Sequence, residues 1–273
     1  MQRIFNGIDW SNKGIKVGET ELAELRFADD VDAISDTEQK LSEMMNNIFV
    51  ESRNGGLHPN IEKTKILTNT NIKSITVNGN NIEVVDSIRY LGQETSFTNN
   101  EETAIDARIS AAWKSFWALK RFFKSSLPMF HKKRLFDACV LPVFTYGTQC
   151  LPLSPKSIAK LEVAQRSMER AMLNVRLTDH MTNKKIRKAT KIRDVKETAK
   201  GLKWSWAGHL SRYNNDRLPK IVEEWIPRDG KRNRGRPNTR WKDDIESFGS
   251  CFWRRKARNK EQWKKMGTSF TQL

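Results

Sequence analysis

The spacing of apolar residues changes near residue 100, and this change constrains the fold more than any other feature of the sequence. Before it, apolar and polar residues alternate over short stretches. One such pair of stretches flanks Asn78-Gly79, a dipeptide typical of two-residue β-hairpin turns. After Glu101, apolar residues recur every three or four positions, which is the period of a helix. The sequence therefore predicts an α+β chain with short antiparallel strands first and mostly helices afterwards.

One helix is expected among the strands of the first third. Asp36 is placed to cap it, with Gln39 three residues later as in a capping box, and Gly55-Gly56 is placed to end it. Its apolar stripe is formed by Leu41, Met44, Met45 and Ile48. These methionines are expected to belong to the core.

The middle third predicts a small bundle of helices. The first helix follows Glu101 and is broken by Pro128, and the second runs from His131 to Leu141 and is stopped or kinked at Pro142. Ser154-Pro155 has the residues that favour the start of a third helix. The apolar face of the first helix is formed by Ile105, Ile109, Ala112, Phe116, Leu119 and Phe123.

Charge is distributed unevenly along the 273 residues. Residues 1–100 hold 10 Lys/Arg and 15 Asp/Glu, a net charge of −5, and the remaining 39 basic and 17 acidic residues give +22, which sums to +17. So basic a chain is expected to bind a densely anionic partner, most often nucleic acid. No apolar run is long enough to cross a membrane, and the three cysteines are too scattered for a disulfide framework, so an intracellular location is expected.

Two stretches of the basic part are candidate nucleic-acid contacts. Residues 184–203 predict one basic surface helix, and a turn-rich loop between Trp225 and Trp241 carries arginines that could bind phosphates while the indoles stack on bases. The alternative is a solvated loop with both tryptophans in a local core. The candidate contacts of the loop are Arg228, Lys231, Arg232, Arg234, Arg236, Arg240 and Trp241.

An acidic hairpin is predicted over residues 25–34, with Asp29 and Asp30 near its tip. Two carboxylates held close together repel each other, and a divalent cation offsets that cost. Carboxylate oxygens suit Mg²⁺, and a pair of such ions can activate a hydroxyl and stabilise a leaving pyrophosphate. A plain solvated turn is the competing interpretation, because Asp-Asp is common in turns.

The residues around this pair resemble the reverse transcriptases of non-LTR retrotransposons, most closely the RTE-like group. The resemblance begins with Gly14-Ile15 and Gly18 and the active-site-like Phe27-Ala28-Asp29-Asp30. It continues, in the same order and spacing as in those elements, through several further segments that reach nearly to the end of the chain: Gly56-Leu57, Asn60, Lys63-Thr64-Lys65, Tyr90-Leu91-Gly92, Trp206-Ala207-Gly208-His209, Gly235-Arg236-Pro237 and Asp243-Asp244-Ile245.

The resemblance implies roles for individual residues. Asp29 and Asp30 would hold catalytic Mg²⁺, and Phe27 and Ala28 would shape the floor near the primer end. Lys63 or Lys65 would act on the leaving pyrophosphate, with Lys65 taken as the catalytic candidate although the spacing does not decide between them. Tyr90 and Gly92 would position the primer. The implied partners are an RNA template, a DNA primer and dNTP, in the nucleus or a cytoplasmic ribonucleoprotein.

The implied organisation has three parts: a partial palm over residues 1–95, a helical thumb over 96–178, and a mostly helical basic region over 179–273. Asp32 departs from the family pattern, which has an apolar residue there. The upstream strand with a third catalytic aspartate, the fingers and the endonuclease have no counterpart, so we expect a fragment that is inactive, or nearly so, alone. The alternatives are a non-catalytic nucleic-acid-binding module and a structural protein-interaction domain.

Overall fold

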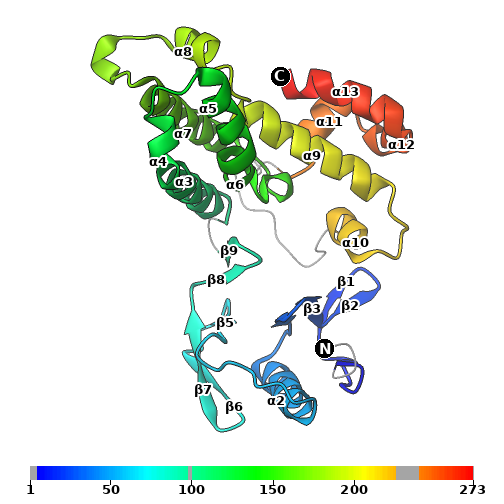
Figure 1. The fold of residues 1–273 in the computed structure, drawn as a ribbon. Helices are drawn as coiled ribbons and strands as arrows, with labels where there is room; N and C mark the ends of the chain where they lie inside the picture. Colours follow the sequence, from blue (N-terminus) through cyan, green and yellow to red (C-terminus); the bar gives the residue numbers. More distant parts are fainter. Residues whose placement is uncertain (1–4, 98–99, 226–239, 273) are drawn as a thin grey trace. The chain divides into compact units, whose positions relative to one another are not determined.

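The computed structural model describes residues 5–97, 100–225 and 240–272, and it confirms the predicted α+β class (Figure 1). Contacts divide the chain into two compact units. The mixed unit comprises residues 1–98 and 215–230, and the helical unit comprises residues 99–214 and 231–273. The three regions predicted from the sequence were assigned by resemblance to known domains, and a division by contacts does not test that assignment.

The mixed unit contains short strands in small sheets. Three antiparallel hairpins pair β1 with β2, β3 with β4 and β8 with β9, while β7 lies between antiparallel β6 and parallel β5. Its described residues also form helices α2 and α10. The bounds are β1 Ile15–Val17, β2 Thr20–Leu22, β3 Glu24–Phe27, β4 Asp30–Ala33, α2 Glu38–Asn54, β5 Ile66–Leu67, β6 Ser74–Val77, β7 Asn80–Val85, β8 Ser87–Tyr90, β9 Gln93–Ser96 and α10 Leu218–Glu224.

The core of the mixed unit forms where α2 lies on β6 and β7. The apolar side chains that meet there are Met45, Phe49, Ile66, Ile75, Val77 and Ile82. The predicted β6–β7 hairpin turn is present, with Asn78 and Gly79 at φ 50° and 75°, and Asn46 of α2 accepts a hydrogen bond from the Asn78 N–H at 2.7 Å. A helix side chain thus fixes the turn against the core.

The N-cap of α2 lies one residue later than predicted. Thr37 has extended backbone, and its hydroxyl accepts a hydrogen bond from the N–H of Lys40. Asp36 instead pairs with the Lys40 ammonium at 2.9 Å. The prediction of an Asp36 cap was wrong because the Asp36 carboxylate is engaged by the Lys40 ammonium, while the Thr37 hydroxyl takes the capping hydrogen bond.

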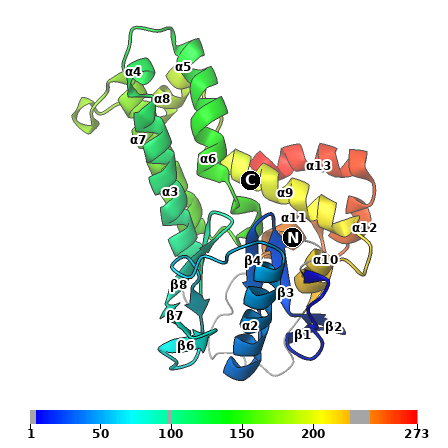
Figure 2. The same ribbon diagram turned by 60° about the horizontal axis from the view of Figure 1, so that its bottom comes forward.

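The helical unit begins with a bundle and ends with a cluster of shorter helices (Figures 1 and 2). The core of the bundle is formed by buried side chains of α3, α4, α6, α7 and the start of α9, and of the turns between them, and α5 packs partly buried side chains against it. The bounds are α3 Asn100–Ala118, α4 Lys120–Phe123, α5 Met129–Leu135, α6 Leu141–Thr145, α7 Pro155–Leu173, α8 Asn183–Thr190, α9 Val195–Ser211, α11 Asp243–Gly249, α12 Trp253–Ala257 and α13 Lys260–Gln272.

Of the two outcomes predicted at Pro142, a stop or a kink, the stop is absent. A single π-helical turn, Phe136–Val140, joins α5 to α6, and Pro142 lies in the first turn of α6. Proline lacks an N–H and its ring collides with the carbonyl four residues earlier in a regular helix. The wider π turn moves that carbonyl away, so the chain continues in a helical path past the proline.

The predicted basic helix over residues 184–203 is two helices. Lys191 ends α8 with a left-handed backbone at φ 52°, and Asp194 caps α9 by accepting hydrogen bonds from the N–H groups of Lys196 and Glu197. The prediction of one helix was wrong because this cap, which requires extended backbone at Asp194, outweighs the helical periodicity of the apolar residues.

Two tryptophans join α9 to α13. The rings of Trp204 and Trp263 stack with centroids 3.7 Å apart, and each indole N–H donates to the backbone carbonyl of the other residue at 2.8 Å. Each ring covers a glycine four residues after the other tryptophan. A Cβ on Gly208 would lie 2.4 Å from the Trp263 ring, and one on Gly267 would lie 2.8 Å from the Trp204 ring.

Within the described ranges, none of the helices combines the length and apolar character needed to cross a membrane.

Candidate functional site

The predicted acidic hairpin is formed by β3 and β4. Phe27 pairs with Asp30, so the two-residue turn is Ala28-Asp29, with Ala28 at φ 55°. A residue with a side chain is strained in this left-handed conformation, which glycine adopts more readily. Asp29 and Asp30 are both exposed at this end of the hairpin.

One face of the hairpin combines apolar and acidic side chains. Residues that pair directly across antiparallel strands point to the same face, and Leu25 pairs with Asp32 while Phe27 pairs with Asp30. Phe27 is 61% exposed on that face. Asp32 therefore lies beside Asp30, whereas Asp29 lies in the turn. The second carboxylate on the strand face is the residue that departs from the family pattern.

The turn between β8 and β9 lies within electrostatic range of this acidic face. Burial raises the pKa of Tyr90, and the charges of Asp32 and Asp30 raise it further. Tyr90 begins a two-residue turn in which Leu91 and Gly92 have φ of 46° and 75°. The structure thus places Tyr90 within electrostatic range of the acidic hairpin, although about 60 residues separate them in the chain.

The carboxylates of Asp30 and Asp32 repel each other on the acidic face. Burial raises the pKa of Asp32, and the neighbouring Asp30 carboxylate raises it further. On the opposite face, Glu24 pairs with Arg26 at 2.8 Å, and the Arg26 guanidinium lies 5.1 Å from the centroid of the Phe5 ring. The arginine is therefore engaged on the other side of the hairpin from Asp30 and Asp32.

The two candidate lysines lie just before β5. Lys65 pairs with Glu83 of β7 at 2.5 Å, and both side chains are more than one-third exposed. Lys63 is exposed in a turn, where its backbone N–H donates to the Asn60 side chain at 3.1 Å. This geometry does not choose between the two lysines for the role implied by the resemblance.

The chemistry of the donors fits one magnesium ion. Mg²⁺ is commonly held by one or two carboxylates together with water and phosphate oxygens, and Asp30 and Asp32 share a face as such a pair. In the part of the chain that the structure describes, no group of three Asp, Glu, His or Cys side chains is placed to hold a metal.

Asp32 was missed as a candidate by sequence reasoning, although a signal was present. In a strand, residues two apart point to the same face. Once the strand is taken to begin at Asp30, Asp32 must accompany it. Asp29 and Asp30 are adjacent in the sequence, whereas Asp30 and Asp32 are adjacent on the strand face.

The candidate loop of the basic region falls largely outside the described residues. Arg228, Lys231, Arg232, Arg234 and Arg236 all lie in the undescribed range 226–239. At its far end Arg240 is exposed, and Trp241 is half-buried. The Trp241 indole N–H donates to the Gln149 carbonyl at 2.7 Å, and the Lys203 ammonium lies 5.5 Å from its ring centroid. Trp241 is thus anchored in the helical unit.

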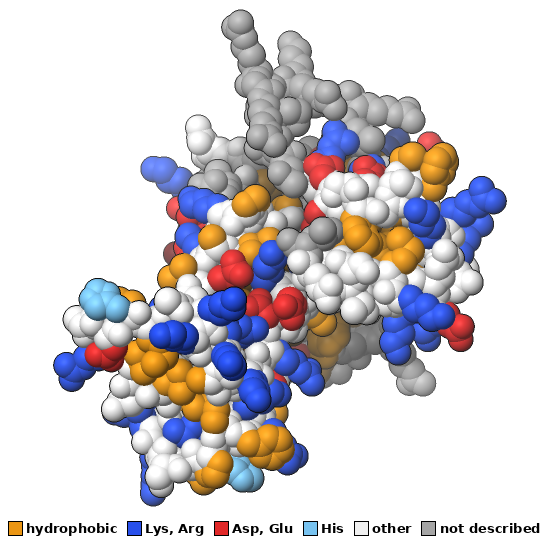
Figure 3. All heavy atoms as spheres, turned by 90° about the horizontal axis from the view of Figure 1, so that it is seen from above, with side chains coloured by type: hydrophobic (Ala, Val, Ile, Leu, Met, Phe, Trp, Pro, Cys, Tyr) orange, Lys and Arg blue, Asp and Glu red, His pale blue; other side chains and the backbone are white. Residues whose placement is uncertain are grey.

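The other basic stretch is only partly on the surface. Lys203 is fully buried, where its ammonium pairs with Asp244 at 2.9 Å and donates to the Pro152 carbonyl. Exposed cations remain on α8 and just after it: Lys184, Lys185, Lys188, Lys191 and Arg193. Figure 3 shows Lys and Arg side chains gathered with apolar ones on one face of the molecule.

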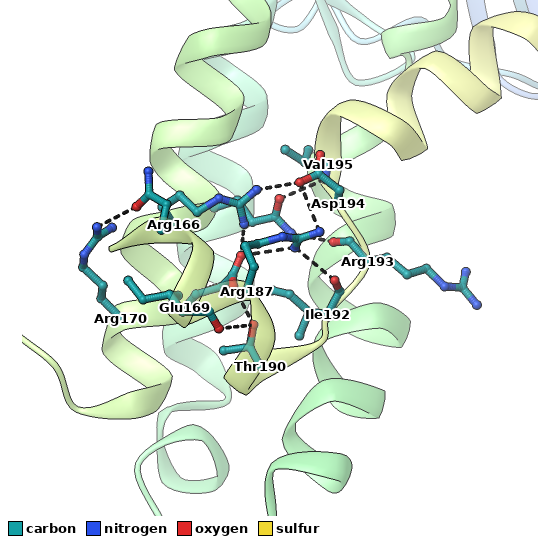
Figure 4. Close-up of polar contacts among 12 residues, drawn as sticks. Arg166, Glu169, Arg170, Arg187, Thr190, Ile192, Arg193, Asp194 and Val195 are labelled. Carbon is teal, nitrogen blue, oxygen red and sulfur yellow. Dashed lines mark hydrogen bonds and ion pairs between the residues drawn. The ribbon is translucent and has the colours of Figure 1, made fainter. Parts of the chain in front are cut away.

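A closed ionic network lies inside the helical unit (Figure 4). Glu169, which is fully buried, accepts hydrogen bonds from Arg166, from Arg187 and, at 2.5 Å, from the Thr190 hydroxyl. Asp194 pairs with Arg166 at 2.5 Å and with Arg187 at 3.2 Å. Two arginines and two carboxylates therefore neutralise each other between α7, α8 and the start of α9, and Arg187 is engaged in structure.

Replacing Asp32 by asparagine is expected to stabilise the mixed unit at pH 7 by less than about 1 kcal/mol. Folding raises the pKa of Asp32, so its ionised form destabilises the folded state above that pKa. The gain should fade as the pH drops through the raised pKa toward the ordinary value of 3.8. Thermal unfolding of both proteins from pH 7 to pH 3.5 measures this difference. A gain that persists or grows at low pH would contradict the assignment.

Comparison with known proteins finds one relevant similarity. The chain is 28% identical over 268 residues to an uncharacterized transposon-derived protein of Caenorhabditis elegans, and the match covers 91% of this chain and 96% of that protein. No family model matches the chain, and no solved structure matches it. The near full-length similarity supports a transposon-related origin for the chain.

Proposed function

We propose that the chain is a nucleic-acid-binding protein of retroelement origin, related to the part of a reverse transcriptase that carries the metal-binding hairpin and the thumb. The observation that carries this proposal is that Tyr90, at the β8–β9 turn, lies within electrostatic range of Asp30 and Asp32. The resemblance requires the primer-positioning turn and the acidic hairpin to be neighbours. Neither the composition of the chain nor its hydrophobic periodicity requires this turn and this hairpin to be neighbours.

Two further observations support the proposal. The similar protein of C. elegans is transposon-derived, and a retroelement is one class of transposon. The chain carries a net charge of +17, and the excess lies in the part that folds mainly as helices. Lysines and arginines on such helices would neutralise the phosphates of an RNA template and a DNA primer, the partners that the resemblance implies.

The reaction of the parent enzymes is metal-assisted phosphoryl transfer, in which Mg²⁺ supplies charge stabilisation at the reacting phosphate. In this chain Asp30 and Asp32 would hold one ion, with Asp29 at the turn beside them. Phe27 and Ala28 would lie under the primer end, Tyr90 and Gly92 would position its backbone, and Lys63 or Lys65 would face the pyrophosphate of a dNTP. Because a third ligand group is not found among the described residues, we propose little or no polymerase activity.

The alternative is a non-catalytic RNA- or DNA-binding module in which the hairpin is only scaffold. The observation that favours it is again the two-carboxylate face, which is incomplete for two metals within the described ranges. The two functions differ in metal dependence. The polymerase-derived site predicts that Mg²⁺ raises the unfolding temperature of the wild type and not of the Asp30→Asn/Asp32→Asn variant, whereas the scaffold predicts no difference.

Equilibrium binding to a labelled RNA–DNA primer–template tests the proposed function. Four phosphate contacts would lower the affinity by about 100-fold between 50 and 200 mM KCl, with little dependence on sequence. Primer extension in the same samples, with Mg²⁺ or Mn²⁺, is expected to be absent or weak. Robust extension that disappears in Asp29→Ala would show that the catalytic site is complete.

A further inference from the structure

Two long stretches of the helical unit contain no acidic residue. Residues 107–136 hold eight Lys/Arg and no Asp or Glu, and residues 180–193 hold six and none. The first includes α4 and α5, the second includes α8, and α5 packs against α8. Both ribbon views place α4, α5 and α8 at the same end of the bundle (Figures 1 and 2). The structure therefore joins two acid-free segments into one surface.

Several cations on this surface have no acidic partner. Among the described residues, Arg121 and Arg134 take part in no ion pair, nor do the exposed Lys184 and Lys188 of α8. The surrounding positive charge also acts on a buried lysine of this region. Burial lowers the pKa of Lys132, and the nearby Lys124 ammonium lowers it further. Such uncompensated charge favours a polyanionic partner.

Two phenylalanines are exposed among these cations. Phe122 of α4 is 51% exposed and Phe130 of α5 is 61% exposed, and only residues 124–128 separate the two helices. The Arg134 guanidinium lies 5.7 Å from the centroid of the Phe130 ring, and the His131 ring is 5.5 Å away edge-on. The ring of Phe130 is thus presented to solvent with a cation at its face.

We propose that this surface, the α4–α5 tip, binds single-stranded nucleic acid. The tip is defined as Arg121, Phe122, Phe130 and Arg134, continued on α8 by Lys184 and Lys188. Exposed aromatic rings stack on unpaired bases while neighbouring cations hold the phosphates, and this combination is typical of single-strand binding. In a duplex the base faces are stacked on one another, so a duplex would contact only the cations, through its phosphates. The inference rests on the proposed function and adds the form of nucleic acid that this surface recognises.

The test compares the full-length wild type with Phe122→Ala/Phe130→Ala on fluorescein-labelled dT20, rU20 and a 20-base-pair duplex. Each ring is expected to contribute about tenfold, so the double variant should bind both single strands about 100-fold more weakly. Its affinity for the duplex should change less than about twofold. Phe122→Trp/Phe130→Trp should restore single-strand binding, since indoles also stack.

Matched controls separate stacking from other effects. Phe252→Ala removes another exposed phenylalanine, 67% exposed and on a different part of the helical unit, and should change no affinity. Arg121→Glu/Arg134→Glu should weaken binding to single strands and duplex alike, and the salt slope should fall, for each phosphate no longer neutralised, by about 0.7 on single strands and about 0.9 on the duplex. Circular dichroism should show that every variant is as helical as the wild type.

The outcomes also separate this inference from the proposed function. If the wild type binds the oligonucleotides and the phenylalanine variant binds them equally well, the tip is not a stacking surface, although the proposed function stands. If the wild type binds no oligonucleotide, both fail. If it binds phosphatidylcholine/phosphatidylserine vesicles more tightly than dT20, and this needs Phe122 and Phe130, the surface is a membrane contact and the inference is wrong.

Discussion

Trp263→Ala is expected to lower the free energy of unfolding of the helical unit by about 4 kcal/mol, one of the two largest effects expected for a single change in this chain. Trp263 is buried, stacks on Trp204 and accepts the indole N–H of Trp204 at its carbonyl, while its own N–H donates to the Trp204 carbonyl. Alanine leaves a cavity between α9 and α13, and it leaves the Trp204 carbonyl without its indole donor.

Glycine makes this packing possible and gives a second way to test it. A methyl group on Gly208 would lie 2.4 Å from the Trp263 ring, so Gly208→Ala should displace the ring and cost about 1–3 kcal/mol. Trp117→Ala is the matched control, because Trp117 is 44% exposed on α3. Urea unfolding followed by circular dichroism measures all three variants. A loss for Trp263→Ala no larger than that for Trp117→Ala would contradict the interlocked packing.

Glu169→Leu is expected to cost about 4 kcal/mol, because it removes one partner from a buried ionic network. Glu169 is fully buried and accepts hydrogen bonds from Arg166, Arg187 and Thr190. Leucine leaves the nearly buried Arg166 with Asp194 alone as its anionic partner. A charge that is left in a low-dielectric interior without full compensation is strongly unfavourable.

The double variant Arg166→Met/Glu169→Leu distinguishes this mechanism from a simple loss of packing. It removes one cation and one anion together and leaves Arg187 paired with Asp194 at 3.2 Å. It should therefore be more stable than Glu169→Leu alone. The exposed pair Lys156–Glu102 provides the control, since Lys156→Ala should change stability by less than about 1 kcal/mol. A double variant as unstable as the sum of its single variants would contradict ionic coupling.

Local features of the fold could be predicted because short sequence patterns determine them. The Asn78-Gly79 turn needs two residues at positive φ, and these two residues adopt it at little cost. The end of α2 at Gly55-Gly56 and the start of α7 after the Ser154 cap follow from capping chemistry in the same way. These features depend on a few neighbouring residues.

Features that depend on distant partners could not be predicted. The Trp204–Trp263 stack joins residues 59 positions apart, and nothing local to Gly208 indicates that an indole will cover it. The break between α8 and α9 places Lys191 in a left-handed conformation that its residue type does not favour. The π turn before Pro142 is similarly a compromise between a proline and the surrounding core.

The site residues that the resemblance implies stay predictions, and the structure adds where they lie relative to one another. The resemblance selected Asp30 and Tyr90, and the structure places them within electrostatic reach of each other. Asp32 was set aside as a departure, yet it is the carboxylate that shares the strand face with Asp30. The assignments to Lys63, Lys65 and the loop arginines remain predictions, because they concern contacts with a ligand rather than contacts within the chain.

Fluorescence anisotropy of a labelled RNA–DNA primer–template, titrated with the full-length chain between 50 and 200 mM KCl, tests the central claim most directly. We predict saturable binding whose affinity falls steeply and linearly on a logarithmic plot against salt, as expected when cations on the chain displace counterions from several phosphates. Absence of binding at 50 mM KCl, or an affinity that does not respond to salt, would contradict a nucleic-acid-binding protein of retroelement origin.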